Sequence, residues 1–123
     1  MKTFKKFLIA LKKQPIYADG FSNREDVFNQ FAKPEDKDIK ICYAVYIQES
    51  YDGNAIVIYY RSSTKKYYEA YGSHCSCYGL DNQWEGNEEI VFEELEKRLI
   101  KNEVYGGDTL AARFKDYLKA NES

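Results

Sequence analysis

Three consecutive segments in the middle of the chain carry the pattern of β-strands joined by short turns, and they constrain the fold most strongly. Apolar and polar residues alternate over residues 39–48, which predicts one strongly apolar face made of Ile39, Ile41, Tyr43, Val45 and Ile47. Turn signals at 52–54 and 62–65 precede further strands predicted at 55–61 and 66–71. Because both connections are short, the pattern predicts an antiparallel meander of about three strands.

Apolar residues recur at helical spacing in four other segments, two before the strands and two after them. The first helix should end at Pro15, and the second should begin with a capping box that starts at Ser22. The third should end at Asn102, and the fourth should be capped by Asp108 or Thr109. The apolar positions are Phe4, Phe7, Leu8 and Leu11, then Val27, Phe28 and Phe31, then Val91, Phe92, Leu95 and Leu99, then Leu110, Phe114, Tyr117 and Leu118.

These elements predict a single α+β domain over residues 1–123, in which two N-terminal and two C-terminal helices flank the sheet. A chain of 123 residues can bury a core without disulfides or metal ions. Twelve tyrosines suit half-buried sheet faces and contact surfaces alike.

Charge is nearly balanced overall and unevenly distributed. The formal net charge is -2, so direct binding to nucleic acid or to an anionic membrane is not expected. Residues 81–103 carry eight acids against three bases, and residues 88–96 are predicted to form an acidic helix. A solvated helix face is one interpretation of this helix. The other is an acidic contact face made of Glu89, Glu93, Glu94 and Glu96.

The cysteine pattern and the apolar runs indicate a cytoplasmic protein. The three cysteines are an odd number, and Cys75 and Cys77 are one residue apart, which is not a disulfide framework. The apolar stretch at 7–11 is too short for a secretory signal, and no apolar run approaches the length of a membrane span.

The segment between Gly72 and Trp84 gathers the residue types that carry chemistry. It holds the sole His, the sole Trp and two of the three cysteines, and we predict it to be a contact loop. Its candidate contact residues are His74, Cys75, Cys77, Tyr78, Gln83 and Trp84.

Three interpretations of this loop remain open. His74, Cys75 and Cys77 are zinc ligands by type, with Cys42 or Asp81 to complete the set, although their spacing is compact. A nucleophilic cysteine beside His74 is a second interpretation. The third is structural, with glycines and small side chains allowing close backbone packing. No cofactor is predicted, with zinc as the alternative. No phosphate-binding loop or nucleophile elbow is present, which favours a binding protein over an enzyme.

The run Gly-Ser-His-Cys-Ser-Cys-Tyr-Gly-Leu at 72–80, followed by Gln83-Trp84-Glu85, resembles a widespread group of small proteins encoded by bacteriophages and prophages. The segment 51–55 extends the likeness, which covers about residues 43–100. Where that group has Pro-Glu after the tryptophan, this chain has Gly86-Asn87. The resemblance implies a phage origin and no particular activity, because none is established for the group.

Small accessory phage proteins often bind and disable a host machine, so the resemblance implies a stoichiometric inhibitor of the anti-CRISPR or host-takeover kind. The expected partner is a host protein or nucleoprotein effector in the host cytoplasm. The alternative is a small-molecule, nucleotide or metal site built from the 72–84 loop. A virion-associated role is a third hypothesis.

Overall fold

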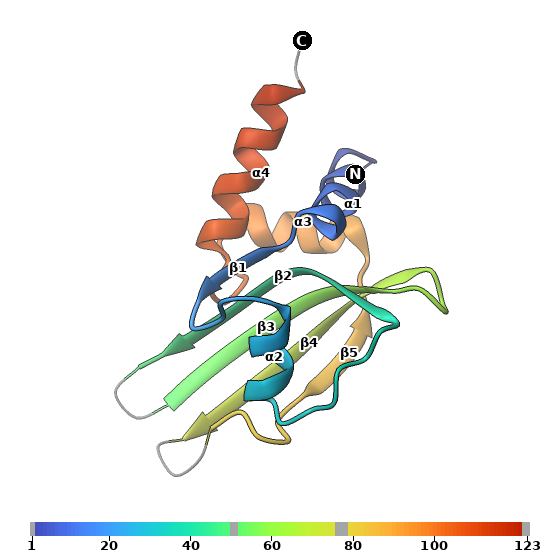
Figure 1. The fold of residues 1–123 in the computed structure, drawn as a ribbon. Helices are drawn as coiled ribbons and strands as arrows, with labels where there is room; N and C mark the ends of the chain where they lie inside the picture. The colour runs from blue at the N-terminus through green and yellow to red at the C-terminus, as the bar shows by residue number, and fades with distance from the viewer. Residues whose placement is uncertain (1, 50–51, 76–78, 122–123) are drawn as a thin grey trace.

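The computed structural model describes residues 2–49, 52–75 and 79–121. The described residues form four helices around one five-stranded sheet (Figure 1). In chain order the elements are α1 (Lys2–Lys13), β1 (Ile16–Asp19), α2 (Arg24–Gln30), β2 (Ile39–Gln48), β3 (Asp52–Arg61), β4 (Lys66–Cys75), β5 (Glu85–Glu89), α3 (Phe92–Ile100) and α4 (Asp108–Ala120). No described helix is long and apolar enough to cross a membrane.

The sheet has the order β1-β2-β3-β4-β5, and its centre is the predicted antiparallel meander β2–β3–β4. The α+β class is therefore confirmed, and the sheet is larger than expected. β1 adds a parallel edge strand beside β2, and β5 adds an antiparallel edge strand beside β4, so the sheet is mixed. β1 is only four residues long, too short to show a period. β5 has the sequence Glu-Gly-Asn-Glu-Glu, which lacks the β-branched and aromatic residues typical of strands.

The apolar alternation along β2 does not define one face, because the strand contains a β-bulge. The register with β3 shifts between Ile41 and Tyr43, which leaves Cys42 as the extra residue. One extra residue reverses which side chains face which way, since side chains alternate with a period of two. Ile39 and Ile41 consequently face α2, whereas Tyr43, Val45 and Ile47 face the other three helices.

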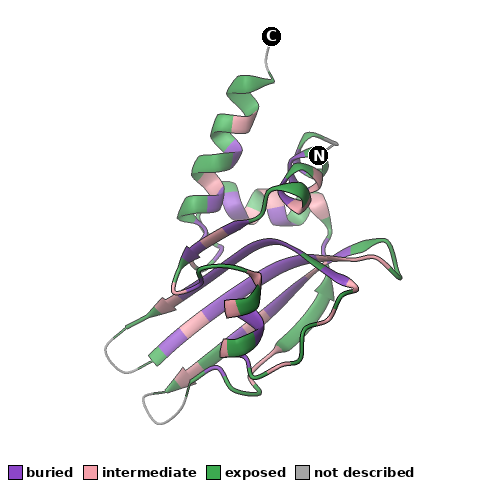
Figure 2. Ribbon diagram, in the orientation of Figure 1, coloured by how far each residue is buried: buried purple, intermediate pink, exposed green. Residues whose placement is uncertain are grey.

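Helices cover both faces of the sheet, and two cores result (Figures 1 and 2). α1, α3 and α4 pack on one face around Phe4, Leu8 and Phe114, and α2 packs on the other around Phe28 and Phe31. β2 and β3 are buried on both sides, which accounts for the unbroken apolar run of β3. Many tyrosines therefore serve packing.

Two predicted helix starts are wrong by one position. Asn23 caps α2 in place of Ser22, because the Asn23 side chain accepts a hydrogen bond from the backbone N–H of Asp26 at 2.9 Å. The Asp26 carboxylate in turn accepts a hydrogen bond from the Ser22 N–H at 2.9 Å. Gly107 caps α4 without a side-chain hydrogen bond. Asn102 follows α3 with φ of +59°, as expected for the residue that ends a helix.

Candidate functional site

The first half of the predicted contact loop is the end of a strand. Gly72 to Cys75 are the last residues of β4, and they pair with residues 52–55 of β3. Cys77 and Tyr78 lie outside the described residues. The second half packs on α2, where Leu80 is buried and the Asn82 N–H donates to the Phe31 carbonyl at 3.1 Å.

His74 is held at both ring nitrogens. Its Nδ1 lies 2.8 Å from the Cys75 carbonyl oxygen, and its Nε2 lies 2.5 Å from the Tyr46 hydroxyl. A carbonyl oxygen only accepts, so Nδ1 donates to Cys75, and Nε2 shares the second hydrogen bond with the Tyr46 hydroxyl. The Gln48 amide donates to the same hydroxyl at 3.0 Å. Burial raises the pKa of Tyr46, so this phenol is neutral at pH 7. The contacts fix the strand end as the structural interpretation predicts.

Cys42 and His74 lie on opposite faces of the sheet and do not meet. Cys42 lies at the β2 bulge among the side chains that face α1, α3 and α4, whereas the His74 ring contacts Tyr46 on the α2 side. Burial raises the pKa of the Cys42 thiol to about 12, and Cys75 is exposed. No group of three His, Cys, Asp or Glu side chains that could hold a metal ion occurs among the residues placed by the structure.

Trp84 is half-buried and packs against the core under α2. Its ring stacks on Phe28 with centroids 6.2 Å apart, meets Phe31 edge-on at 5.0 Å and contacts Tyr59 at 5.7 Å. Tyr59 pairs with Tyr68, which precedes His74 on β4 by six residues, or about 20 Å of strand. The structure therefore does not bring Trp84 together with His74.

The other residues of this segment make local contacts. The Gln83 amide donates to the Asp81 carbonyl at 3.4 Å, and the Trp84 Nε1–H donates to the Asn87 side chain at 2.7 Å. Gly86 has φ of +91°, which proline cannot adopt. Proline could therefore not replace Gly86 without a change of backbone conformation.

The acidic segment is divided between a strand and a helix, so the single acidic helix predicted at 88–96 is wrong. Glu89 ends β5, whose five residues are all exposed (Figure 2). Its carboxylate pairs with Lys66 at 3.3 Å. Glu93 and Glu94 are exposed in the first turn of α3, and Glu96 is half-buried one turn later. β5 is an edge strand, so the acidic residues of β5 lie at the edge of the sheet.

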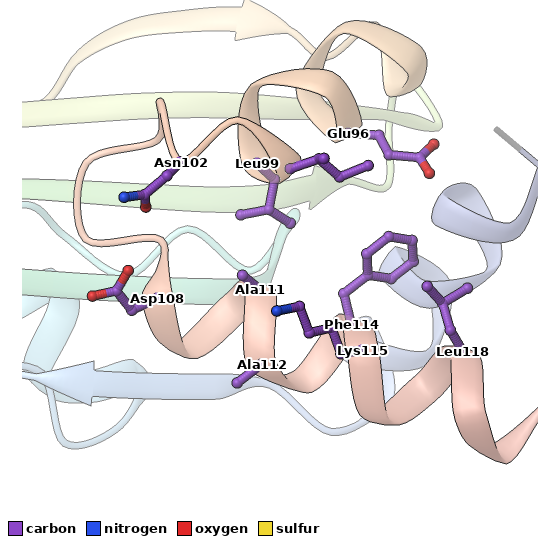
Figure 3. A pocket seen from close by; sticks show the side chains of 10 residues that line it. Glu96, Leu99, Asn102, Asp108, Ala111, Ala112, Phe114, Lys115 and Leu118 are labelled. Atoms are coloured by element: carbon purple, nitrogen blue, oxygen red, sulfur yellow. The ribbon is translucent and has the colours of Figure 1, made fainter.

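A groove between α3 and α4 was not predicted from the sequence. It encloses about 520 Å³, with Glu96 and Asp108 toward opposite ends (Figure 3). Its apolar residues are Leu99, Ile100, Ala111, Ala112, Phe114 and Leu118. Ile100 is 70% exposed, and Leu118, one of the apolar positions of the predicted fourth helix, is 37% exposed. The sequence signal that could have predicted this groove is that α3 and α4 carry more apolar positions than one helix face can bury.

The comparisons with known proteins add no relative. The chain was compared with protein-family models, curated proteins and solved structures, and nothing matched.

Proposed function

We propose that this chain is a phage-encoded accessory protein that binds one host protein stoichiometrically and inhibits it, as an anti-defence or host-takeover factor. The phage origin rests on the resemblance of residues 72–85. The observation that carries the binding role is the composite surface of α3: an acidic first turn beside the acidic β5 edge, followed by the apolar groove toward α4.

The two parts of this surface suit one kind of partner. Acidic side chains attract a basic surface, such as the nucleic-acid groove of a host effector, and increase the rate of encounter. A groove of about 520 Å³ can receive an aromatic anchor, and a few such buried anchors carry most of the binding energy in protein interfaces. The proposed partner is therefore a host nucleic-acid-handling protein with a basic surface next to an exposed apolar residue.

Charge on an edge strand has a second explanation, since acids at an edge also prevent sheets from joining. That explanation covers Glu85, Glu88 and Glu89 of β5. It does not extend to the exposed Ile100 at the groove, because exposed apolar side chains favour association.

The test is capture from bacterial lysate at physiological salt, followed by a measurement of stoichiometry with the purified partner. We expect a 1:1 complex that displaces nucleic acid from the partner. Changing Glu93 and Glu94 to Gln should weaken binding by about twofold to tenfold, as expected for exposed charge pairs. The matched control changes the exposed Glu25 and Glu49 to Gln and should leave affinity unchanged.

The groove is tested separately. Ile100→Ser should weaken binding at least about fivefold if the groove holds an apolar anchor. Ala120→Ser, an exposed change beyond the groove on α4, is the control. Failure to retain any host protein, or equal losses in the test and control variants, would refute the proposal.

A further inference from the structure

A second, smaller cavity lies where β4, β5 and the first turn of α3 meet. It encloses about 80 Å³, enough for a small polar group. Its walls are formed by Glu69, Glu88, Glu89, Ile90, Val91, Glu94, Leu95 and Arg98. Figure 1 shows that these elements adjoin at the β5 edge of the sheet.

Glu69 is the buried polar side chain of this cavity. It is 5% exposed, and its Oε2 accepts from the Tyr71 hydroxyl at 2.6 Å and from Arg98 Nη1 at 3.1 Å. Its Oε1 is buried and has no hydrogen-bond donor among the residues that the structure describes. Buried carboxylate oxygens are normally satisfied, so an unsatisfied oxygen on a residue that lines a cavity leaves a place for a donor from outside the chain.

The surrounding charges select a cationic donor. Glu88 pairs directly with Glu69 across the two strands, and Glu94 lines the same cavity from α3. Arg98 is the basic residue of the lining, and it already binds the other oxygen of Glu69. The carboxylates of the cavity therefore outnumber its cations, which favours a positively charged occupant.

We propose that this cavity binds the ε-ammonium group of a lysine side chain presented by the partner protein. An ammonium is compact and has three donors, so it can bind Glu69 and a neighbouring carboxylate together once Oε1, which is buried in the free chain, turns toward the cavity. The apolar walls of Ile90, Val91 and Leu95 suit the methylenes of the lysine stem. The origin of the lysine rests on the proposed function, because a host partner must supply it.

The experiment is a titration of the purified chain with blocked lysine, Nα-acetyl-lysine methylamide, followed by ¹³C NMR of the glutamate carboxyl groups. We expect a saturable shift of the Glu69 carboxyl signal with lysine and none with the Nε-acetylated analogue. Tetramethylammonium chloride at equal concentration should also give none, because it has the charge without a donor.

Variants locate the site. Glu88→Gln and Glu94→Gln change exposed side chains, so the fold is retained. Each variant should bind the blocked lysine at least threefold more weakly than the wild type. The control Glu25→Gln removes the same charge from α2 on the other face of the sheet and should not change the affinity. Glu69→Gln removes the carboxyl group that is observed, so binding to this variant is followed by the backbone amides around the cavity. The saturable shift that lysine causes in these amides should be abolished, provided that the circular dichroism of the variant matches that of the wild type.

Several results overturn the proposal. A cavity that holds only water gives no saturable shift, and general charge attraction gives equal shifts with tetramethylammonium. Spermidine binding more than tenfold tighter than blocked lysine would assign the cavity to free polyamines instead. The titration uses the chain alone, so its failure leaves the host-protein proposal standing, and failed capture leaves a positive titration standing.

Discussion

Replacing Gly72 by alanine should overpack the core under α2. A Cβ at this position would lie 2.5 Å from Phe31 Cε1, 3.0 Å from Phe31 Cζ and 3.1 Å from Leu80 Cδ2. Phe31 is 1% exposed and is held in place by Trp84, so it cannot turn away without disturbing its neighbours. Overpacking of this kind costs about 1–3 kcal/mol of unfolding free energy.

The size of the effect can be followed by thermal unfolding. With an unfolding entropy of about 2.1 cal/mol/K per residue, 1 kcal/mol corresponds to about 4 °C in Tm for a chain of 123 residues. Gly72→Ala should therefore lower Tm by about 4–12 °C. Gly79→Ala is the matched control: among the described residues, the nearest non-neighbouring atom to its added Cβ is Asp81 Oδ1 at 3.9 Å, so the change should be neutral or slightly stabilising.

A double variant separates crowding from other effects. Phe31→Leu provides room, so the loss in the double variant with Gly72→Ala should be smaller than the sum of the single losses by at least about 0.5 kcal/mol. A Gly72→Ala protein that melts within 1 °C of the wild type would refute the reasoning. So would additivity in the cycle, since it would show that Phe31 is not the group displaced.

Three further predictions follow from the buried polar groups. Tyr46→Phe and His74→Ala should each lower the free energy of unfolding in urea by about 1 kcal/mol. The double variant should lose less than the sum of the two single losses, because both changes remove the same hydrogen bond. Additive losses would contradict this. At pH 8 iodoacetamide should modify Cys75 and spare Cys42, whose pKa rises from 9.0 to about 12 and whose thiolate fraction is therefore lower by about a thousandfold; equal labelling in peptide mass spectrometry would show that burial does not protect it. Burial, with a hydrogen bond to a carboxylate, raises the pKa of Tyr71 from 10.0 to about 12. The stability that the neutral Tyr71 phenol contributes is therefore complete below pH 10 and is lost as pH rises through 12. The wild type should lose more free energy of unfolding than Tyr71→Phe over that range.

The meander and the helices could be predicted because their signals are local. Period-two and helical spacing depend on neighbouring residues, and Asn102 ends α3 by a backbone preference of its own type. The bulge at Cys42 could not be predicted, because nothing in the residue itself marks an extra position in the pairing with β3. β5 is likewise a strand through its pairing with β4, in spite of its composition.

The candidate site shows the same limit. The clustering of His74 and Trp84 in sequence suggested one site, but the strand direction carries them to different places on the sheet. The α3–α4 groove and the cavity beside Glu69 each require knowledge of which elements meet, which spacing along one segment cannot supply. Short-range patterns therefore predicted elements, and tertiary packing decided which side chains share a surface.

The packing of Trp84 against the core under α2 has a practical consequence for fluorescence measurements. Trp84 is the sole tryptophan of the chain, and its neighbours Phe28 and Phe31 belong to the core on the opposite face of the sheet from the α3–α4 groove. Its fluorescence should change when the chain unfolds and that core is lost, and it should remain unchanged when a ligand occupies the groove. One emission signal can thus distinguish a binding defect from a folding defect in every surface variant named above.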